Sequence, residues 1–225
     1  MTLVEQAKVD IQQYLDRENG ELLFNERDLQ MHLAQHLFNI GHYDDVDVEY
    51  YVPYEELDDY IWKNELKLDI LLRKDHEFLP IELKYKTKKH SKRLMRFGEQ
   101  LNDAVEVLKN QGAQDLGMYD FWKDVRRVEL VRNRFPSVKN GLAVFVTNDK
   151  QYINPSRETS NNRLFSMEEG VHGTVKHWQQ SESTCAKTHP DFDLDNKYTI
   201  HWNHNSYEGV EFHYCIVTVP DNSSL

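Results

Sequence analysis

The sequence predicts an α/β fold, a three-layer α/β/α sandwich around a central mixed β-sheet. Residues 45–52 and the two halves of residues 67–86 alternate apolar with polar side chains, which is typical of strands whose two faces meet different surroundings. Residues 141–147, GLAVFVT, form a continuous apolar run bounded by turn residues, as expected of a strand buried on both faces. Because helical patterns separate this run from the earlier strands, we expect it to join the sheet as a parallel strand, with helices covering both faces.

Length and composition indicate one domain over residues 1–225, since 225 residues suffice for one substantial core and are few for two. No apolar run approaches the roughly 20 residues that cross a bilayer, so we expect no membrane association. The first residues lack the basic-then-apolar pattern of a signal peptide. The two cysteines lie far apart in the sequence and suggest a reducing compartment, so a cytoplasmic protein is expected.

Two helical patterns precede the first strand. Residues 4–15 show loose helical spacing and lead into a polar segment that contains a glycine. A second helix is predicted to begin after Asn25, a favourable N-cap, and to end at Gly41. Glu26 lies one turn before Leu29 and opens the apolar stripe of this helix, so we expect it to face the interior. The simpler interpretation is a carboxylate that stabilises the positive end of the helix dipole.

The candidate catalytic residues lie in a hairpin that is predicted over residues 67–86, KLDILLRKDHEFLPIELKYK. Its first strand is expected to place Leu68 and Ile70 on one face and Asp69 on the other. One surface of the hairpin would therefore carry three charged side chains: Asp69, Glu82 and Lys84.

Such a cluster is suited to metal-dependent hydrolysis. Two carboxylates can bind a hard divalent cation such as Mg²⁺, and a neighbouring lysine can position a metal-bound water and stabilise charge on phosphate oxygens. The simpler interpretation is a solvated strand face with a cross-strand ion pair, which stabilises a protein by less than about 1 kcal/mol.

A basic segment follows directly on the second strand. Residues 84–96 contain seven Lys or Arg residues and no Asp or Glu, whereas the whole chain has a net charge of −11, which leaves −18 for the remainder. An acidic body repels a phosphate backbone, so this segment is either a solvated surface or the local attraction for nucleic acid. The candidate phosphate contacts are Lys86, Lys88, Lys89, Lys92 and Arg93.

Two further helices are predicted before the buried strand. Residues 92–110 keep a 3.6-residue apolar period, and Gln100 falls inside that stripe, either as a satisfied core group or as part of the site beside Lys84. Residues 118–134 form the other helix, whose charged residues are interpreted as a solvated face with internal ion pairs: Asp124, Arg126, Arg127 and Glu129. After residue 148 we expect a short helix over residues 166–180. Two strands, at residues 198–202 and 211–219, are expected to extend the sheet, with HNSYEG as their turn.

The central stretch and its flanks resemble the catalytic core of the PD-(D/E)xK nuclease superfamily, the restriction-endonuclease-like fold. In that family a helix bearing a Glu is followed by a strand, a strand ending in a catalytic Asp, a strand with (D/E)xK and a helix. The resemblance spans roughly residues 20–147. Its motif positions here are Glu26, Asp69 and Glu82-Leu83-Lys84. Leu68 stands where the family name has Pro.

The resemblance implies a nuclease that hydrolyses phosphodiester bonds of nucleic acid, with DNA the favoured partner. It implies Mg²⁺ or Mn²⁺ as the cofactor. The implied ligands are Asp69, Glu82, the backbone carbonyl of Leu83, and Glu26 directly or through water. Lys84 would position the attacking water, and Gln100 would support Lys84 or the phosphate. A homodimer would suit the cleavage of both strands of a duplex.

Other classes are disfavoured by missing motifs. The chain has no GxxxxGK[ST] or GxGxxG loop for phosphates, no GxSxG serine elbow and no CxxC or HExxH spacing for zinc. Two alternatives stay open. One is a catalytically inactive relative of the nucleases that binds nucleic acid or protein. The other is an interaction protein whose acidic surface binds a basic partner.

Overall fold

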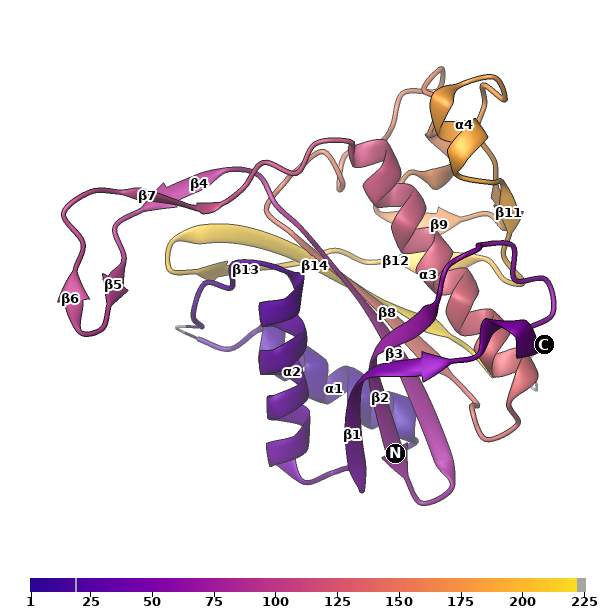
Figure 1. Cartoon of the computed structure of the whole chain (residues 1–225), viewed down its shortest axis with the longest axis horizontal. Helices are drawn as coiled ribbons and strands as arrows, with labels where there is room; N and C mark the ends of the chain where they lie inside the picture. Colours follow the sequence, from indigo (N-terminus) through magenta and orange to yellow (C-terminus); the bar gives the residue numbers. More distant parts are fainter. Residues whose placement is uncertain (19, 222–225) are drawn as a thin grey trace.

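The computed structural model of the chain describes residues 1–18 and 20–221, and its centre is a six-stranded mixed β-sheet (Figure 1). The strand order is β1-β2-β3-β8-β14-β13, and all neighbours are antiparallel except β3 and β8, which are parallel. The strands are β1 (Asp45–Val52), β2 (Leu66–Lys74), β3 (Glu77–Lys86), β8 (Gly141–Thr147), β14 (Val210–Val219) and β13 (Asn203–Tyr207). The predicted mixed α/β class, the strand at residues 45–52, the hairpin and the parallel strand are therefore confirmed.

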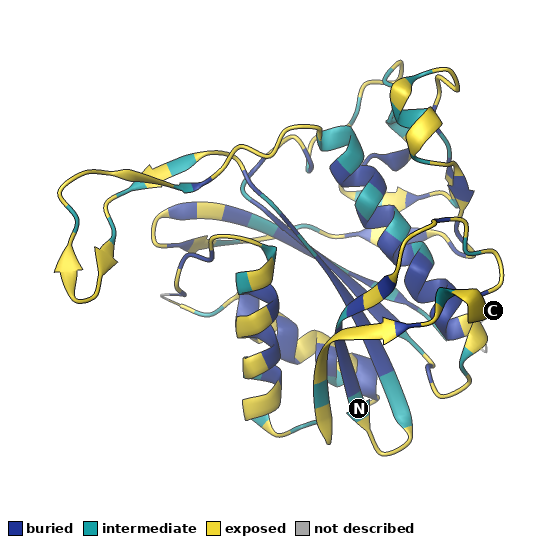
Figure 2. Ribbon diagram, in the orientation of Figure 1, coloured by how far each residue is buried: buried dark blue, intermediate teal, exposed yellow. Residues whose placement is uncertain are grey.

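Helices cover both faces of the sheet. Helices α1 (Leu3–Leu15) and α2 (Glu26–Ile40) share one apolar core with β3, and helix α3 (Gln114–Arg134) shares another core with the opposite face (Figure 1). These two faces are called the α2 side and the α3 side below. Figure 2 shows that buried residues concentrate in the central strands and on the inner face of α3. No helix in the described part of the chain is long and apolar enough to cross a membrane.

Local signals set the ends of α2 as predicted. The side chain of Asn25 accepts a hydrogen bond from the Asp28 N–H at 3.0 Å, and Gly41 ends the helix with φ of 72°. A side-chain hydrogen bond from an Asn N-cap and a glycine in the left-handed conformation are common signals for the start and the end of a helix.

The alternation predicted for β2 is wrong at one point. Leu68 lies in the core of the α3 side, whereas Ile70 lies in the core of the α2 side, although both have even numbers. The face to which the side chains of β1 point also changes at this level. There Glu49 has φ of 53°, while its neighbours Val48 and Tyr50 keep their pairing with β2. A left-handed residue interrupts the extended backbone conformation on which the alternation of side chains depends, so the side chains before and after it can face opposite sides. Glu49 and Asp69 mark this reversal.

The helix predicted over residues 92–110 is wrong. Four short strands form a long hairpin arm that projects from the end of β3 (Figure 1): β4 (His90–Lys92), β5 (Met95–Arg96), β6 (Glu99–Gln100) and β7 (Val105–Leu108). The arm turns at Phe97 and Gly98, whose φ values of 55° and 83° belong to a hairpin turn and cannot continue an α-helix. The apolar residues of this segment would stabilise a helix only if other elements packed against them. Most of the arm is exposed instead (Figure 2).

The C-terminal third also departs from expectation. The helix predicted at residues 166–180 is absent from the described chain, and the strand predicted at residues 198–202 does not join the central sheet. Instead β13, which overlaps the predicted turn, pairs with β14 at the sheet edge. The remaining short elements are η1 (Tyr54–Glu56), η2 (Arg163–Phe165), β9 (Gly170–His172), β10 (Val175–Lys176), α4 (Thr184–Thr188), β11 (Phe192–Asp193) and β12 (Tyr198–Ile200). Strand β9 pairs with β12 and β10 with β11, and aromatic residues from this region pack against α3.

Candidate functional site

Asp69 lies where β2 and β3 separate. The ladder between these strands runs from Lys74–Glu77 to Ile70–Ile81 and stops there. At the next position the Asp69 carboxylate accepts a hydrogen bond from the Leu83 N–H at 2.6 Å, in place of a strand carbonyl. Burial raises the pKa of Asp69 to about 6, against the opposing attraction of Lys84.

Glu26 reaches the same edge of β3 from the first turn of α2. Its carboxylate accepts a hydrogen bond from the Tyr85 N–H at 2.9 Å, two residues beyond the amide that Asp69 binds. Beyond Ile81, β3 no longer pairs with β2. There the carboxylates of Asp69 and Glu26 accept the hydrogen bonds of alternate amides of β3. The expectation that Glu26 faces the protein and contributes to the site region is consistent with this contact.

Glu82 and Lys84 point to the α3 side, as the period of two requires. Glu82 is only 2% exposed, and its carboxylate lies 3.6 Å from the Arg127 guanidinium. Arg127 also pairs with Asp124 at 3.1 Å, and Asp124 pairs with the Lys84 ammonium at 2.7 Å. Positive and negative groups thus alternate along a buried chain between β3 and α3.

Asp124 and Arg127 belong to this candidate site, and neither was predicted from the sequence as a site residue. Both are buried, so the predicted solvated face is wrong at these positions. A signal was present, because Asp124, Val128 and Val131 follow the i, i+4, i+7 spacing of a core-facing helix stripe. A buried carboxylate on such a stripe requires a cationic partner.

Burial and charge act in opposite directions on these groups. Burial raises the pKa of Glu82 well above its usual value, with Arg127 opposing. Burial would lower the pKa of Lys84, but Asp124, Glu26, Glu82 and Asp69 outweigh it and raise that pKa. Lys84 therefore stays protonated at neutral pH.

We define the site cluster as six residues: Glu26, Asp69, Glu82, Lys84, Asp124 and Arg127. Four carboxylates face two cations, so its formal charge is −2 when all are ionised. One carboxylate oxygen of Glu82 and one of Asp124 are buried and accept no hydrogen bond from the described residues, although each lies within ion-pair distance of a cation.

The donor chemistry of this cluster suits a hard divalent cation, but its arrangement is not a preformed cage. Among the described residues, no group of three or more His, Cys, Asp or Glu side chains is placed to hold a metal ion. Asp69 and Glu26 lie along the edge of β3, while Glu82 is turned toward Arg127. Mg²⁺ is commonly held by one or two carboxylates with waters and substrate phosphates, so it does not require a cage of three protein carboxylates.

An open polar pocket lies on the α2 side of the cluster. It has a cavity volume of about 370 Å³, and Glu26, Asp69 and Lys86 line it. Glu49, which the sequence analysis did not select, also lines it through the reversal of β1. Gln30 fixes this wall, because its amide donates to the Glu49 carboxylate at 3.0 Å and to the Asp69 carbonyl at 2.8 Å.

Gln100 is not part of this site. It lies on β6 in the distal arm, is exposed, and donates its side-chain amide to the Leu94 carbonyl at 3.3 Å (Figure 1). Its assignment depended on a helix beside Lys84, and the hairpin turn at Phe97 replaces that helix.

The basic residues divide into paired and unpaired groups. Lys88 pairs with Asp149 at 3.4 Å, Lys89 with Glu106 at 2.7 Å, and Lys92 with Glu208. Lys86 lines the polar pocket, and Arg93 is exposed at the arm without an ion-pair partner among the described residues.

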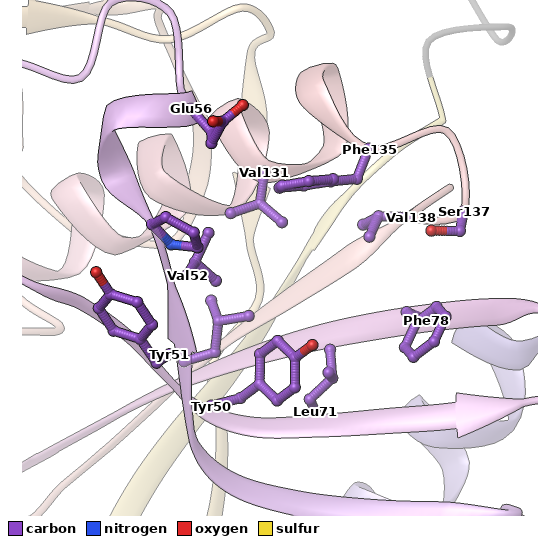
Figure 3. A pocket seen from close by; sticks show the side chains of 12 residues that line it. Tyr50, Tyr51, Val52, Glu56, Leu71, Phe78, Val131, Phe135, Ser137 and Val138 are labelled. Carbon is purple, nitrogen blue, oxygen red and sulfur yellow. The ribbon is translucent and has the colours of Figure 1, made fainter.

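A second pocket, of about 330 Å³, opens on the α3 side beside β1 (Figure 3). Its walls are aromatic and aliphatic, with Tyr50, Phe78 and Phe135 around the opening. Its carboxylate, Glu56, is engaged by Arg134 at 2.7 Å. Because its walls offer little polar chemistry, this pocket is not the candidate functional site.

Comparison of the chain with protein-family models, with curated proteins and with solved structures finds no match.

Proposed function

We propose that this chain is a divalent-metal-dependent nuclease that hydrolyses phosphodiester bonds, with DNA as the favoured substrate and a restriction-endonuclease-like sandwich as its scaffold. The order of elements supports the proposal: α2 with Glu26, then β1, β2 with Asp69, β3 with Glu82-Leu83-Lys84, then α3 and β8. The observation that carries it is the end of the β2–β3 ladder, where β2 stays paired with β1 but separates from β3, and Asp69 lies beside the strand that holds Glu82 and Lys84.

The proposed cofactor is Mg²⁺ or Mn²⁺, held by Asp69, Glu82, the Leu83 carbonyl and Glu26. When bound, such an ion polarises a phosphoryl oxygen and lowers the pKa of bound water. The chain's own residues have separate tasks. Lys84 is kept charged by the carboxylates around it, so it orients water and stabilises developing negative charge as a donor, and it does not serve as a general base. Arg127 holds Glu82, so an ion at Glu82 must compete with this ion pair.

The same ion pairs favour one alternative function. Arg127 with Glu82, and Asp124 with Lys84, satisfy much of the charge without a metal. A catalytically inactive relative that binds nucleic acid or protein would have these contacts. The nuclease and the binding module differ in metal dependence, because an ion that binds the folded state stabilises it.

The test is cleavage of single- and double-stranded DNA and RNA with Mg²⁺ or Mn²⁺, together with metal binding measured by calorimetry. Asp69→Asn should weaken metal binding. Lys84→Met should retain it and lower turnover by at least about 100-fold, the scale of losing one preorganised donor.

Because Lys84→Met leaves Asp124 without its partner, Lys84→Met/Asp124→Asn removes the pair as a unit and controls for instability. Lys67→Met, an exposed lysine on β2, should cleave at the wild-type rate. Neither cleavage nor metal binding by the folded wild-type protein would reject the nuclease and favour the binding module.

A further inference from the structure

The tip of the arm carries a residue that folding does not explain. Phe97 is fully exposed and has φ of 55°, followed by Gly98 with φ of 83°. Two consecutive positive φ values are those of a type I′ hairpin turn, in which Asn, Asp or Gly are favoured at the first position. A bulky residue is unfavourable there. Phe97 thus neither packs in a core nor is a residue that this turn prefers, so its ring is available for contact with a partner.

The charge of the arm identifies the kind of partner. Residues 88–111 contain six Lys or Arg residues and three Asp or Glu residues, a net of +3, so the rest of the chain carries −14. Arg93 and Arg96 lie on either side of exposed Met95, next to the tip. A basic stem with an apolar aromatic tip is complementary to a polyanion that also offers flat apolar faces, and nucleic acid has both features.

The arm is also placed at the site. It begins at the end of β3 and returns into α3 (Figure 1). The residues at its base, Lys86 and Gln111, line the polar pocket beside Glu26. Near its tip, the Arg96 guanidinium lies 5.2 Å from the ring centre of Phe24, two residues before Glu26. The arm therefore spans from one wall of the pocket to the start of α2.

We propose that the arm is a nucleic-acid clamp, in which Arg93 and Arg96 contact phosphates and the Phe97 ring stacks on a base. The inference rests on the proposed function, since it assigns the substrate-holding element of that site. The ligand chemistry is the π-face of a nucleobase, supplied either by an unpaired base or by an opened step of a duplex.

The decisive variant is Phe97→Asn, because Asn-Gly is the preferred sequence of a type I′ turn. Its thermal stability should equal or exceed that of the wild type. In chelator, its Kd for single- or double-stranded oligonucleotides should rise about 5- to 150-fold, the effect of losing one base–aromatic stack. Whichever oligonucleotide shows the rise identifies the source of the stacked base. Val105→Asn, on the arm but away from the tip, should change Kd by less than about twofold.

Two controls distinguish base stacking from charge attraction and the arm from the metal site. Binding of polyphosphate, which has no bases, should be unchanged in Phe97→Asn but weakened in Arg93→Gln/Arg96→Gln. Hydrolysis of bis(p-nitrophenyl) phosphate with Mn²⁺ tests the metal site separately in the wild type and in Val105→Asn, which should hydrolyse it at equal rates. Absence of this hydrolysis in both proteins would reject the proposed nuclease, while the binding data would still decide on the clamp.

Three results would overturn the clamp. The first is unchanged oligonucleotide affinity in Phe97→Asn, and the second is an equal loss for polyphosphate. The third is a wild-type dimer that Phe97→Asn converts to a monomer without changing oligonucleotide affinity, which would assign the tip to a second copy of the chain.

Discussion

Asp69→Asn is predicted to stabilise the metal-free protein while removing its response to metal. The Asp69 carboxylate is partly buried at the end of the β2–β3 ladder, and its pKa is raised from 3.8 to about 6, mainly by burial. An asparagine has nearly the same shape, and its carbonyl oxygen can still accept the hydrogen bond from the Leu83 N–H. The substitution therefore imitates the protonated acid.

The magnitude follows from the two pKa values. Because the folded protein binds this proton more tightly than the unfolded chain, protonated Asp69 contributes stability that is fully present below about pH 4 and is lost as the pH rises through about 6. A shift of about two units corresponds to about 3 kcal/mol. Asp69→Asn should thus match the wild type near pH 4 and exceed its free energy of unfolding by up to about 3 kcal/mol at pH 8.

Urea unfolding in chelator at half-unit steps from pH 4 to pH 8 measures this difference. Asp47→Asn, an exposed position on the neighbouring strand β1, should show no comparable pH dependence. A difference that stays constant with pH, or an Asp69→Asn protein that is the less stable one at pH 8, would refute the reasoning.

Metal addition completes the experiment. A ligand at 100 times its Kd stabilises the folded state by about 2.7 kcal/mol. We expect Mn²⁺ to stabilise the wild type at pH 8 and to lose this effect below about pH 6, because a coordinating carboxylate must be ionised. Asp69→Asn should show little stabilisation by Mn²⁺ at any pH.

Three further outcomes are expected. Arg127→Met should lower the free energy of unfolding by about 3–5 kcal/mol because it leaves buried carboxylates unpaired, whereas Arg134→Met, which breaks an exposed pair, should cost less than about 1 kcal/mol in the same chemical unfolding assay. Lys86→Gln/Arg93→Gln should lower the slope of log K against log salt for nucleic-acid binding by nearly two, and an unchanged slope would make both residues ordinary surface. Gly141→Ala should lower the melting temperature, because its Cβ would lie 2.1 Å from a methyl group of Val128, and overpacking of this kind costs about 1–3 kcal/mol.

Elements with strong local signals could be predicted from the sequence. The alternation of residues 45–52, the Asn25 cap and Gly41 stop of α2, and the apolar run at residues 141–147 each depend on neighbours within a few residues. The arm could not be predicted by the same means. Its apolar residues repeat every 3.6 positions, but a stripe forms a helix only when another element covers it, and residues 92–107 are largely exposed.

The residues of the candidate site were predicted only in part, since Gln100 lies on the distal arm and the partners Asp124 and Arg127 were not predicted. The alternation of side chains along a strand places Glu82 and Lys84 on one side of β3, and they do lie together there. The same alternation does not predict the side on which Asp69 lies. The side chains of β2 change faces near Asp69, opposite the left-handed Glu49 of β1, and no pattern within β2 reveals this change.

The ion pairs between β3 and α3 could not be predicted from local patterns either, because they join residues about 40 positions apart. Yet burial makes such partners necessary: an ionised Glu82 at 2% exposure is stable only beside a cation. Arg127 fills that role in the metal-free protein, and a divalent ion would have to replace it at the same carboxylate. In the proposed nuclease, the ion pair that stabilises the fold would therefore also oppose metal binding. The proposal of a metal site therefore predicts that Arg127, a residue without a place in the nuclease motif, controls how tightly an ion binds there.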